Sequence, residues 1–298
     1  MQDHLAEKNV STAKAPLRFG LSALVLGNLA LSIGPWLVRE ADTGPVASAF
    51  WRLILAVPLL FLFARRFGGR VTLPAPALLG LMAAGGLFFA ADLAAWHIGI
   101  FYTKLANSNL LGNSTSFLLP LWAFITARQW PSTKQGGALG LAALGAIFLM
   151  GRSFELSPDN LYGDLLCLLA GALYTAYLIV MARARGEAGP WPTLAWVTLL
   201  AAPPLLVAAL AMGETIIPQT WTPLLLLALF SQIIGQGLMI YAIGRVSAVI
   251  FGLLLLLQPA LAALIGWFVY NERLGTVDLV GAILIGLALV LVSQPEKA

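Results

Sequence analysis

Ten hydrophobic segments, each about long enough to cross a bilayer, constrain the fold of this 298-residue chain more than any other feature. A transmembrane helix needs about 20 apolar residues. Only 10% of the residues are charged, whereas soluble proteins carry about 25%. The segments lie at about 19–38, 44–64, 75–99, 103–126, 136–151, 160–183, 191–212, 222–243, 246–270 and 275–293. We therefore predict an all-α integral membrane protein of ten transmembrane helices with short connections.

The basic residues predict how the chain is oriented in the membrane. If the N-terminus lies in the cytoplasm, twelve Lys and Arg residues fall at the inner side and four at the outer side, with Arg52 the one basic residue placed within the membrane. Because inner loops are rich in Lys and Arg, we predict that both termini are cytoplasmic. Residues 1–17 are expected to be a disordered N-terminal segment, and residues 294–298 a cytoplasmic tail. Basic residues scattered over short loops give no reason to expect a nucleic-acid partner.

Weak sequence matches recur about 140 residues apart, in the same order along the chain. Val57-Pro58 matches Pro203-Pro204, Pro120 matches Pro259, and Gly140 and Gly145 match Gly281 and Gly286. A repeat unit of five spans is odd, so its second copy enters the membrane from the opposite side. We predict two inverted five-helix repeats, at 18–151 and 152–293, around a central cavity. Spans 5 and 10 are expected to be close-packed supports or a dimer surface, because they carry small residues such as Gly136 and Gly140.

The stretch from Asn107 to Pro120 is too polar for a helix that faces lipid. Asn109, Asn113, Ser116 and Pro120 follow one helical face. Asparagine is costly in hydrocarbon unless it is paired, so this face meets either protein or a water-filled cavity. Taken alone, the stretch fits hydrogen bonding between helices as well as it fits a cavity. We expect the mid-span prolines of spans 4 and 9, Pro120 and Pro259, to act as hinges.

Amide side chains lie near the centres of four different spans. These are Asn28, Asn113, Gln232 and Gln258, and Gln236 shares a helical face with Gln232. A common depth favours one cavity over scattered helix contacts. Aromatic residues on the same spans either wall a site for an apolar or aromatic solute or simply pack. The predicted substrate-binding residues are Asn28, Asn113, Ser116, Trp122, Tyr174, Tyr177, Gln232, Gln236 and Gln258.

Three ionisable side chains within the spans are candidates for substrate binding or coupling. Arg52, near the centre of span 2, either holds a substrate carboxylate or, as the more ordinary arrangement, forms a buried ion pair or contacts carbonyls. Asp92 is the candidate partner for the ion pair. Asp92 is the candidate proton carrier if transport is proton-driven. His97, near the outer end of span 3, either relays protons or is an interfacial residue. A carboxylate near the start of span 6, Asp164, is explained by the partial charge of the helix N-terminus.

Several classes of function lack their motifs in this sequence. Neither a G-x-S-x-G nor an H-E-x-x-H motif is present, so we expect no enzyme activity and no catalytic residues. The absence of a G-x-x-x-x-G-K-[ST] motif argues against ATP-driven transport within this chain. His97 has no neighbouring His or Cys, so no metal site and no cofactor are expected. The single cysteine, Cys167, excludes an intrachain disulfide.

Several motifs resemble those of the drug/metabolite transporter superfamily, in particular its ten-helix EamA-type members. They are F-W-R-L-I-L-A at 50–56, D-L-A-A-W-H at 92–97, the mid-span prolines, and N-E-R-L-G-T-V-D-L-V-G-A-I-L-I-G at 271–286. The chain is similar to YddG-type amino-acid exporters of that superfamily. The resemblance implies a secondary transporter that exports small metabolites, aromatic or neutral amino acids above all, by alternating access across the bacterial inner membrane.

The resemblance leaves other functions of the same fold open. One is an importer or exchanger, and another is a non-transporting membrane subunit that binds or senses a ligand. The expected partners are a small-molecule substrate and the lipid bilayer, and both a monomer and a homodimer are compatible with the sequence.

Overall fold

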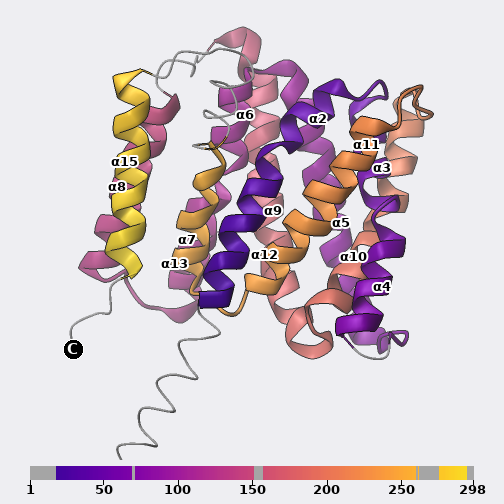
Figure 1. Cartoon of the computed structure of the whole chain (residues 1–298), viewed down its shortest axis with the longest axis horizontal. Coiled ribbons are helices and arrows are strands. Elements are labelled where there is room, and N and C mark those ends of the chain that lie inside the picture. Colours follow the sequence, from indigo (N-terminus) through magenta and orange to yellow (C-terminus); the bar gives the residue numbers. More distant parts are fainter. Residues whose placement is uncertain (1–17, 69–70, 151–156, 260, 262–274, 294–298) are drawn as a thin grey trace, which may run out of the picture.

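In the computed structural model, all ten hydrophobic segments are helical over their described residues. The structure describes residues 18–68, 71–150, 157–259, 261 and 275–293, and within these it contains no β-sheet (Figure 1). Seven helices there are long and apolar enough to cross a membrane, and Ala248–Pro259 and Leu279–Val292 are shorter apolar helices. The predicted all-α membrane fold is confirmed. The predicted N-terminal segment, C-terminal tail and repeat boundary at 151/152 lie outside the described residues.

The helices follow the ten predicted spans closely. Span 1 is Arg18–Glu40, which ends in α2 (Gly34–Glu40). The others, in chain order, are α3 (Pro45–Ile54) with α4 (Val57–Phe67), α5 (Pro76–Tyr102), α6 (Leu105–Gly112) with α7 (Thr115–Ala127), α8 (Thr133–Met150), α9 (Leu161–Ala188), α10 (Pro190–Ala211), the composite span 8, α13 (Ala248–Leu255) and α15 (Thr276–Ser293). Span 8 consists of α11 (Thr222–Leu226), the π-helix η2 (Leu227–Gln236) and α12 (Gly237–Ala242). A short 3₁₀ turn, η1 (Pro158–Asn160), precedes α9.

Proline defines where several of these helices begin. Pro45, Pro58, Pro76 and Pro190 occupy the first turn of α3, α4, α5 and α10. Proline is favoured there because its missing N–H would have no partner in the helix and its fixed φ already suits the helix. Helix starts were therefore readable from the sequence to within a few residues.

Among the described residues, the interruptions of spans 4 and 9 lie before the prolines that we expect to act as hinges. Span 4 breaks at Asn113 and Ser114, whereas α7 continues through Pro120. Span 9 has a turn at Leu256, three residues before Pro259. The observed breaks therefore lie N-terminal to both prolines. A proline removes the hydrogen bond to the carbonyl four residues earlier. For Pro259 this is Leu255, next to the turn at Leu256, whereas for Pro120 it is Ser116, which lies within α7.

The helix contacts follow the pattern expected of an inverted repeat. Helices α3 and α4 pack on α10, α7 packs on α13, and α8 packs on α15, so each pairs span n with span n+5. The contact of α3 with α5 in the first half has its counterpart in that of α10 with α12. The first helix begins and α15 ends at the same edge of the bundle, the lower edge in Figure 1. This placement agrees with an even number of spans.

Spans 5 and 10 form a closely packed pair at one side of the bundle (Figure 1). A Cβ atom on Gly145 of α8 would lie 2.8 Å from the carbonyl oxygen of Gly281 in α15, so the two backbones meet here. Apolar side chains surround this contact: Ala138, Ala142, Ala146, Ile285 and Ala288. The expectation of close packing is confirmed. It uses Gly145, whereas a Cβ on Gly136 or Gly140 would meet only open space.

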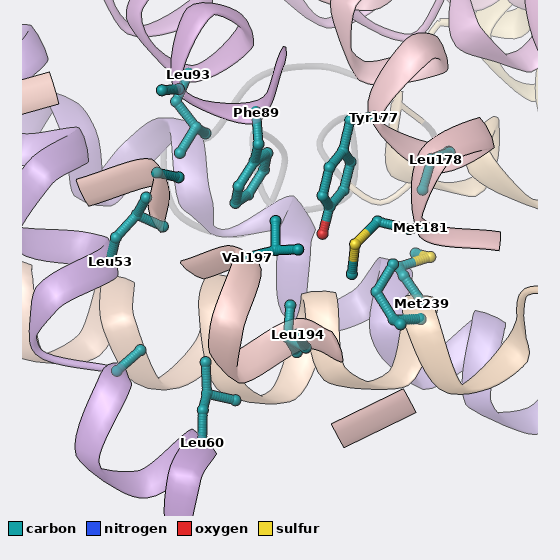
Figure 2. Packing of buried hydrophobic residues seen from close by; sticks show 14 of the residues in the cluster. Leu53, Leu60, Phe89, Leu93, Tyr177, Leu178, Met181, Leu194, Val197 and Met239 are labelled. Atoms are coloured by element: carbon teal, nitrogen blue, oxygen red, sulfur yellow. The ribbon is translucent and has the colours of Figure 1, made fainter. Parts of the chain in front are cut away.

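The main apolar core joins both halves of the chain. Figure 2 shows Leu53 of α3, Leu60 of α4 and Phe89 of α5 facing Met181 of α9, Val197 of α10 and Met239 of α12. Tyr177 stacks on Phe89, with ring centroids 4.4 Å apart. Of these residues, Leu60, Met181 and Met239 lie toward the edge of the bundle that holds the two described chain ends. We call this cluster the apolar plug, because it fills the interface between the two halves.

The opposite edge is held by a polar contact between the two halves. The carboxylate of Glu214 accepts hydrogen bonds from the backbone N–H groups of Val46 (3.2 Å) and Ala47 (2.7 Å), in the first turn of α3. Asp42 accepts in the same way from the N–H groups of Gln219 and Thr220. Carboxylates are favourable partners for the free N–H groups of a helix start. The connections after span 1 and after span 7 are thereby fastened together.

We expect Glu214→Ala to destabilise the protein by about 1–2 kcal/mol, because helix-capping contacts are typically worth that much. The measurement is thermal unfolding of the purified protein in detergent. Glu187→Ala is the matched control, because Glu187 is exposed at the end of α9. Equal unfolding temperatures for the two variants would contradict a stabilising role for the Glu214 contact.

Candidate functional site

A cavity of about 80 Å³ lies between the two halves of the bundle. Spans 1, 2, 3, 4, 6, 8 and 9 contribute to its wall. The lining residues are Leu31, Gly34, Arg52, Phe89, Asp92, Leu93, Trp96, Asn109, Gly112, Asn113, Tyr174, Ser231, Gln236 and Gln258. Phe89 and Leu93 belong both to this wall and to the apolar core, so the cavity adjoins the apolar plug.

Two opposite charges face this cavity without a close partner. Arg52 is 4% exposed and Asp92 is 8% exposed. Among the described residues, neither side chain has a hydrogen-bonding partner or an ion pair within 4.0 Å, and the buried Nε of Arg52 is unsatisfied. The guanidinium lies over the Phe89 ring, 5.9 Å from its centroid. The expected close Arg52–Asp92 ion pair is therefore not formed, and the two charges attract each other only at longer range.

Unpaired buried charges are expensive, so this arrangement is informative. Taking a charge out of water costs several kcal/mol unless another group compensates it. Charged residues inside a membrane bundle accordingly pair with each other or mark a path for a substrate or ion. In this cavity a bound solute with both charges would supply each side chain with its missing partner.

Neutral polar groups around the cavity are held in place while keeping hydrogen-bonding capacity. Tyr174 and Gln236 hydrogen-bond each other through the tyrosine hydroxyl (3.2–3.3 Å). The Gln258 amide donates to Asn28 Oδ1 (2.9 Å), and the Asn113 amide donates to the Asn109 carbonyl (2.8 Å). An amide carries two donor hydrogens and an acceptor oxygen. Each of these side chains is therefore anchored by one contact and can still bind a solute.

Of the predicted site residues, six line the cavity. These are Asn113, Tyr174, Gln236, Gln258, Arg52 and Asp92. Two others lie directly behind them: Asn28 supports Gln258, and Tyr177 stacks on Tyr174 with centroids 5.6 Å apart. Eight of the residues predicted from the sequence therefore lie at the cavity or directly behind its wall.

Four predicted site residues lie away from the cavity. Ser116 is buried where α7 packs on α13. Trp122 is 43% exposed on the outer surface of the bundle. Gln232 is buried and donates to Thr198 Oγ1 of α10 at 2.9 Å. The fourth residue, His97, has its Nδ1 bonded to Ser48 Oγ at 2.8 Å, and it lies beneath the start of α3.

The π-helix explains why Gln232 turns away. An α-helix would place Gln232 and Gln236 on one face. In η2 the hydrogen bonds run from i to i+5, and the residues that line the cavity are Ser231 and Gln236, five apart. No residue pattern in the sequence predicts this change from an α-helix to a π-helix.

Sequence reasoning missed several lining residues, and some had a usable signal. Asn109 lies one turn before Asn113 on the same polar stripe. Trp96, which was not among the predicted site residues, packs on span 4, where a Cβ on Gly112 would lie 3.0 Å from its Nε1.

The polar stretch of span 4 serves both roles that were left open. Asp164 of α9 accepts hydrogen bonds from Thr103 Oγ1 (2.5 Å) and from the amide of Asn107 (2.9 and 3.2 Å). Asn107 therefore joins two helices, whereas Asn109 and Asn113 face the cavity.

Within the described part of the chain, no group of three or more His, Cys, Asp or Glu residues is placed to hold a metal.

Comparisons with known proteins show which transporters the chain resembles. Residues 161–294 match the EamA-like transporter family. An uncharacterized transporter of Archaeoglobus fulgidus is 24% identical over 83% of this chain and 86% of its own length, and a second from that organism is 26% identical over 94% and 98%. The threonine/homoserine exporter RhtA of Escherichia coli is 35% identical, over 48% of this chain and 50% of its own.

The fold also has a counterpart among solved structures. A crystal structure that is 16% identical in sequence superposes with a TM-score of 0.74, over 94% of this chain and 97% of that one. At this identity the likeness concerns the fold. The family match over residues 161–294, the relatives named as transporters and the helical bundle described above together support a multi-pass membrane transporter whose second half resembles the EamA-like transporter family.

Proposed function

We propose that this transporter exports small zwitterionic metabolites, neutral amino acids in particular, by alternating access across the bacterial inner membrane with both termini in the cytoplasm. The observation that carries the proposal is the pair of unpartnered charges, Arg52 and Asp92, in one cavity. An α-amino acid is a zwitterion in which a carboxylate and an ammonium group are attached to the same carbon. Such a solute neutralises both side chains at once.

Each group of an amino acid has a matching partner in this site. The Arg52 guanidinium binds the carboxylate, a contact that is short and charge-assisted. The Asp92 carboxylate accepts from the ammonium group. Gln236 and Gln258 hydrogen-bond the remaining polar atoms, and Trp96 and Leu31 lie against the substrate side chain. Neutral amides bind such groups without the strong attraction that would hinder release.

The size of the cavity and one relative favour small substrates. About 80 Å³ is well below the roughly 300–1,000 Å³ of pockets for drug-sized ligands. RhtA, which is similar over half of each chain, is named a threonine/homoserine exporter. We therefore place small neutral amino acids such as threonine and homoserine ahead of aromatic ones.

Alternating access requires the closed half of the interface to open. In the proposed cycle the apolar plug, which meets the cavity at Phe89, is the barrier between the cavity and the cytoplasmic side. In the proposed cycle the helices of the plug, α4 and α10 among them, move apart to open the cavity to the cytoplasm. The contact between Glu214 and α3 holds the opposite edge.

Transport by the purified full-length chain in proteoliposomes tests the proposal. The substrates are threonine, homoserine, alanine and phenylalanine, each compared with an analogue that lacks the amino group and one that lacks the carboxyl group. We expect flux of the small zwitterions and at least about tenfold less of either analogue, because each analogue leaves one buried charge unpaired.

The same experiment separates the alternative functions. Binding of amino acids without flux would favour a sensory subunit, and equal flux of the analogues would exclude zwitterion recognition. Direction is read in cells: overproduction of the chain should lower the intracellular level of an exported amino acid and raise its level in the medium. Accumulation inside the cells would favour an importer.

A further inference from the structure

A second, larger hollow lies on the outside of the bundle, between α7 and α8. Its volume is about 630 Å³. Apolar side chains form its length: Phe117, Leu121, Phe124, Ile125 and Leu139. Polar residues and a tryptophan form one end, at the connection between the two helices: Arg128, Gln129, Trp130 and Pro131. We call this feature the α7–α8 groove.

The groove is apolar along its length and polar at one end, as a lipid molecule is. Its apolar length runs beside a transmembrane helix, and its polar end lies where the chain leaves the membrane. Trp130 is 94% exposed, and tryptophan favours the boundary between hydrocarbon and headgroups. The predicted orientation places this connection on the cytoplasmic side, where anionic lipids attract basic residues.

The backbone at Arg128 is unusual for a residue of its type. Arg128 follows α7 in the left-handed conformation (φ 51°), the only non-glycine residue with positive φ among those the structure describes. The turn is closed by hydrogen bonds from Arg128 N–H to Ile125 O and from Gln129 N–H to Phe124 O. Glycine, or sometimes asparagine, usually occupies this position, because it adopts the left-handed conformation with less strain. An arginine here places a cation at the mouth of the groove despite that strain.

We propose that the α7–α8 groove binds an anionic phospholipid, with one acyl chain along Phe117, Leu121 and Ile125 and the phosphate group at Arg128. Charge complementarity selects the occupant: the groove end carries a cation, so a phosphatidylglycerol headgroup is attracted and a zwitterionic headgroup much less so. The groove and the cavity share no lining residue, and the proposal does not depend on what the transporter carries.

Native mass spectrometry of the full-length protein in detergent tests the headgroup preference. Phosphatidylglycerol and phosphatidylcholine with identical acyl chains are added at equal concentration. We expect the wild type to retain phosphatidylglycerol roughly fivefold better, as expected for one cation near a lipid headgroup. Arg128→Asn should abolish the preference. Asparagine tolerates the left-handed conformation, so this variant removes the charge without straining the turn, and Arg128→Gly serves as a second variant.

A photoactivatable phosphatidylglycerol, with its reactive group on the acyl chain, locates the site. Cross-links should fall in the segment 117–139 and be competed by phosphatidylglycerol. Arg66→Gln is the matched control, because Arg66 is exposed near the same predicted membrane surface at the end of α4 and should leave both readouts unchanged. Equal retention of the two lipids, a preference that survives Arg128→Asn, or cross-links elsewhere would each overturn the proposal.

Discussion

We expect Arg52→Gln to lower the transport of a neutral amino acid at least about thirtyfold while the protein stays folded. Loss of one partner from a buried, hydrogen-bonded charge pair costs about 2–5 kcal/mol, and 2 kcal/mol already corresponds to roughly thirtyfold. Arg52 has no hydrogen-bonding partner among the described residues, so its removal breaks no bond of the empty protein. The readouts are initial transport rate in proteoliposomes and thermal unfolding of the same preparation.

The reciprocal variant makes this prediction specific. Asp92→Asn should also lower amino-acid transport, but the two variants should differ toward analogues. Arg52→Gln should bind an amine that lacks the carboxyl group no worse than the wild type does, and Asp92→Asn should behave likewise toward a carboxylic acid that lacks the amino group. Arg66→Gln is the control for loss of a basic residue away from the cavity. Wild-type transport rates in Arg52→Gln would show that Arg52 does not bind substrate.

Stability gives an independent check on the same pair. Buried charges without close partners are a cost to folding, and replacing both with neutral groups is often neutral or stabilising. We expect the double variant Arg52→Gln/Asp92→Asn to unfold at a temperature no lower than the wild type, and above either single variant. Stability gained with activity lost is the pattern of a site maintained for function.

The fold was predictable because the bilayer leaves few choices. Backbone groups in hydrocarbon must be satisfied within helices, so ten apolar segments imply ten helices, and prolines such as Pro45 and Pro190 indicate where helices begin. The site was predictable in part for the same reason. Polar side chains such as Asn113 and Gln258 are costly in contact with lipid. Those at a common depth therefore meet at the interface of the two halves.

The errors arose where a local change of backbone decides which way a side chain faces. Helical spacing placed Gln232 beside Gln236, but the π-helix turns it to Thr198. The same spacing assumed one continuous helix from Asn109 to Pro120, whereas the break at Asn113 separates the cavity-lining part from the part that packs on α13. Trp122 lies beyond that break and reaches the lipid-facing surface. These departures depend on tertiary contacts that spacing alone does not contain.

The two halves share a scaffold but differ in chemistry. The offset of 146 residues that relates the proline pairs of spans 2 and 7 places Thr198 at the position of Arg52. Thr198 accepts a hydrogen bond from Gln232 and lies outside the cavity wall. The charge at the site therefore comes from the first half. Helices α7 and α13, by contrast, pack closely against each other. We expect a larger side chain at their contact to destabilise the protein.

Gly252→Ala should destabilise the protein by about 1–3 kcal/mol, the usual cost of overpacking a well-packed core. Gly252 of α13 lies against Pro120 of α7, and an added Cβ would lie inside van der Waals contact of the Ser116 carbonyl oxygen and 3.0 Å from Pro120 Cγ. Pro120 leaves that carbonyl without its helical donor. The absence of a side chain at Gly252 therefore allows α13 to pack against the Ser116 carbonyl of α7.

A second substitution separates this cause from a general intolerance of alanine in helices. Pro120→Ala removes the ring that the new Cβ would meet, and it restores an N–H donor to the Ser116 carbonyl. We expect Gly252→Ala/Pro120→Ala to recover part of the unfolding temperature lost by Gly252→Ala. Gly140→Ala is the matched control, because its Cβ would meet open space and alanine favours a helix by about 1 kcal/mol. Strictly additive effects of the two changes would mean that Gly252 and Pro120 are not in contact, since only neighbouring residues couple.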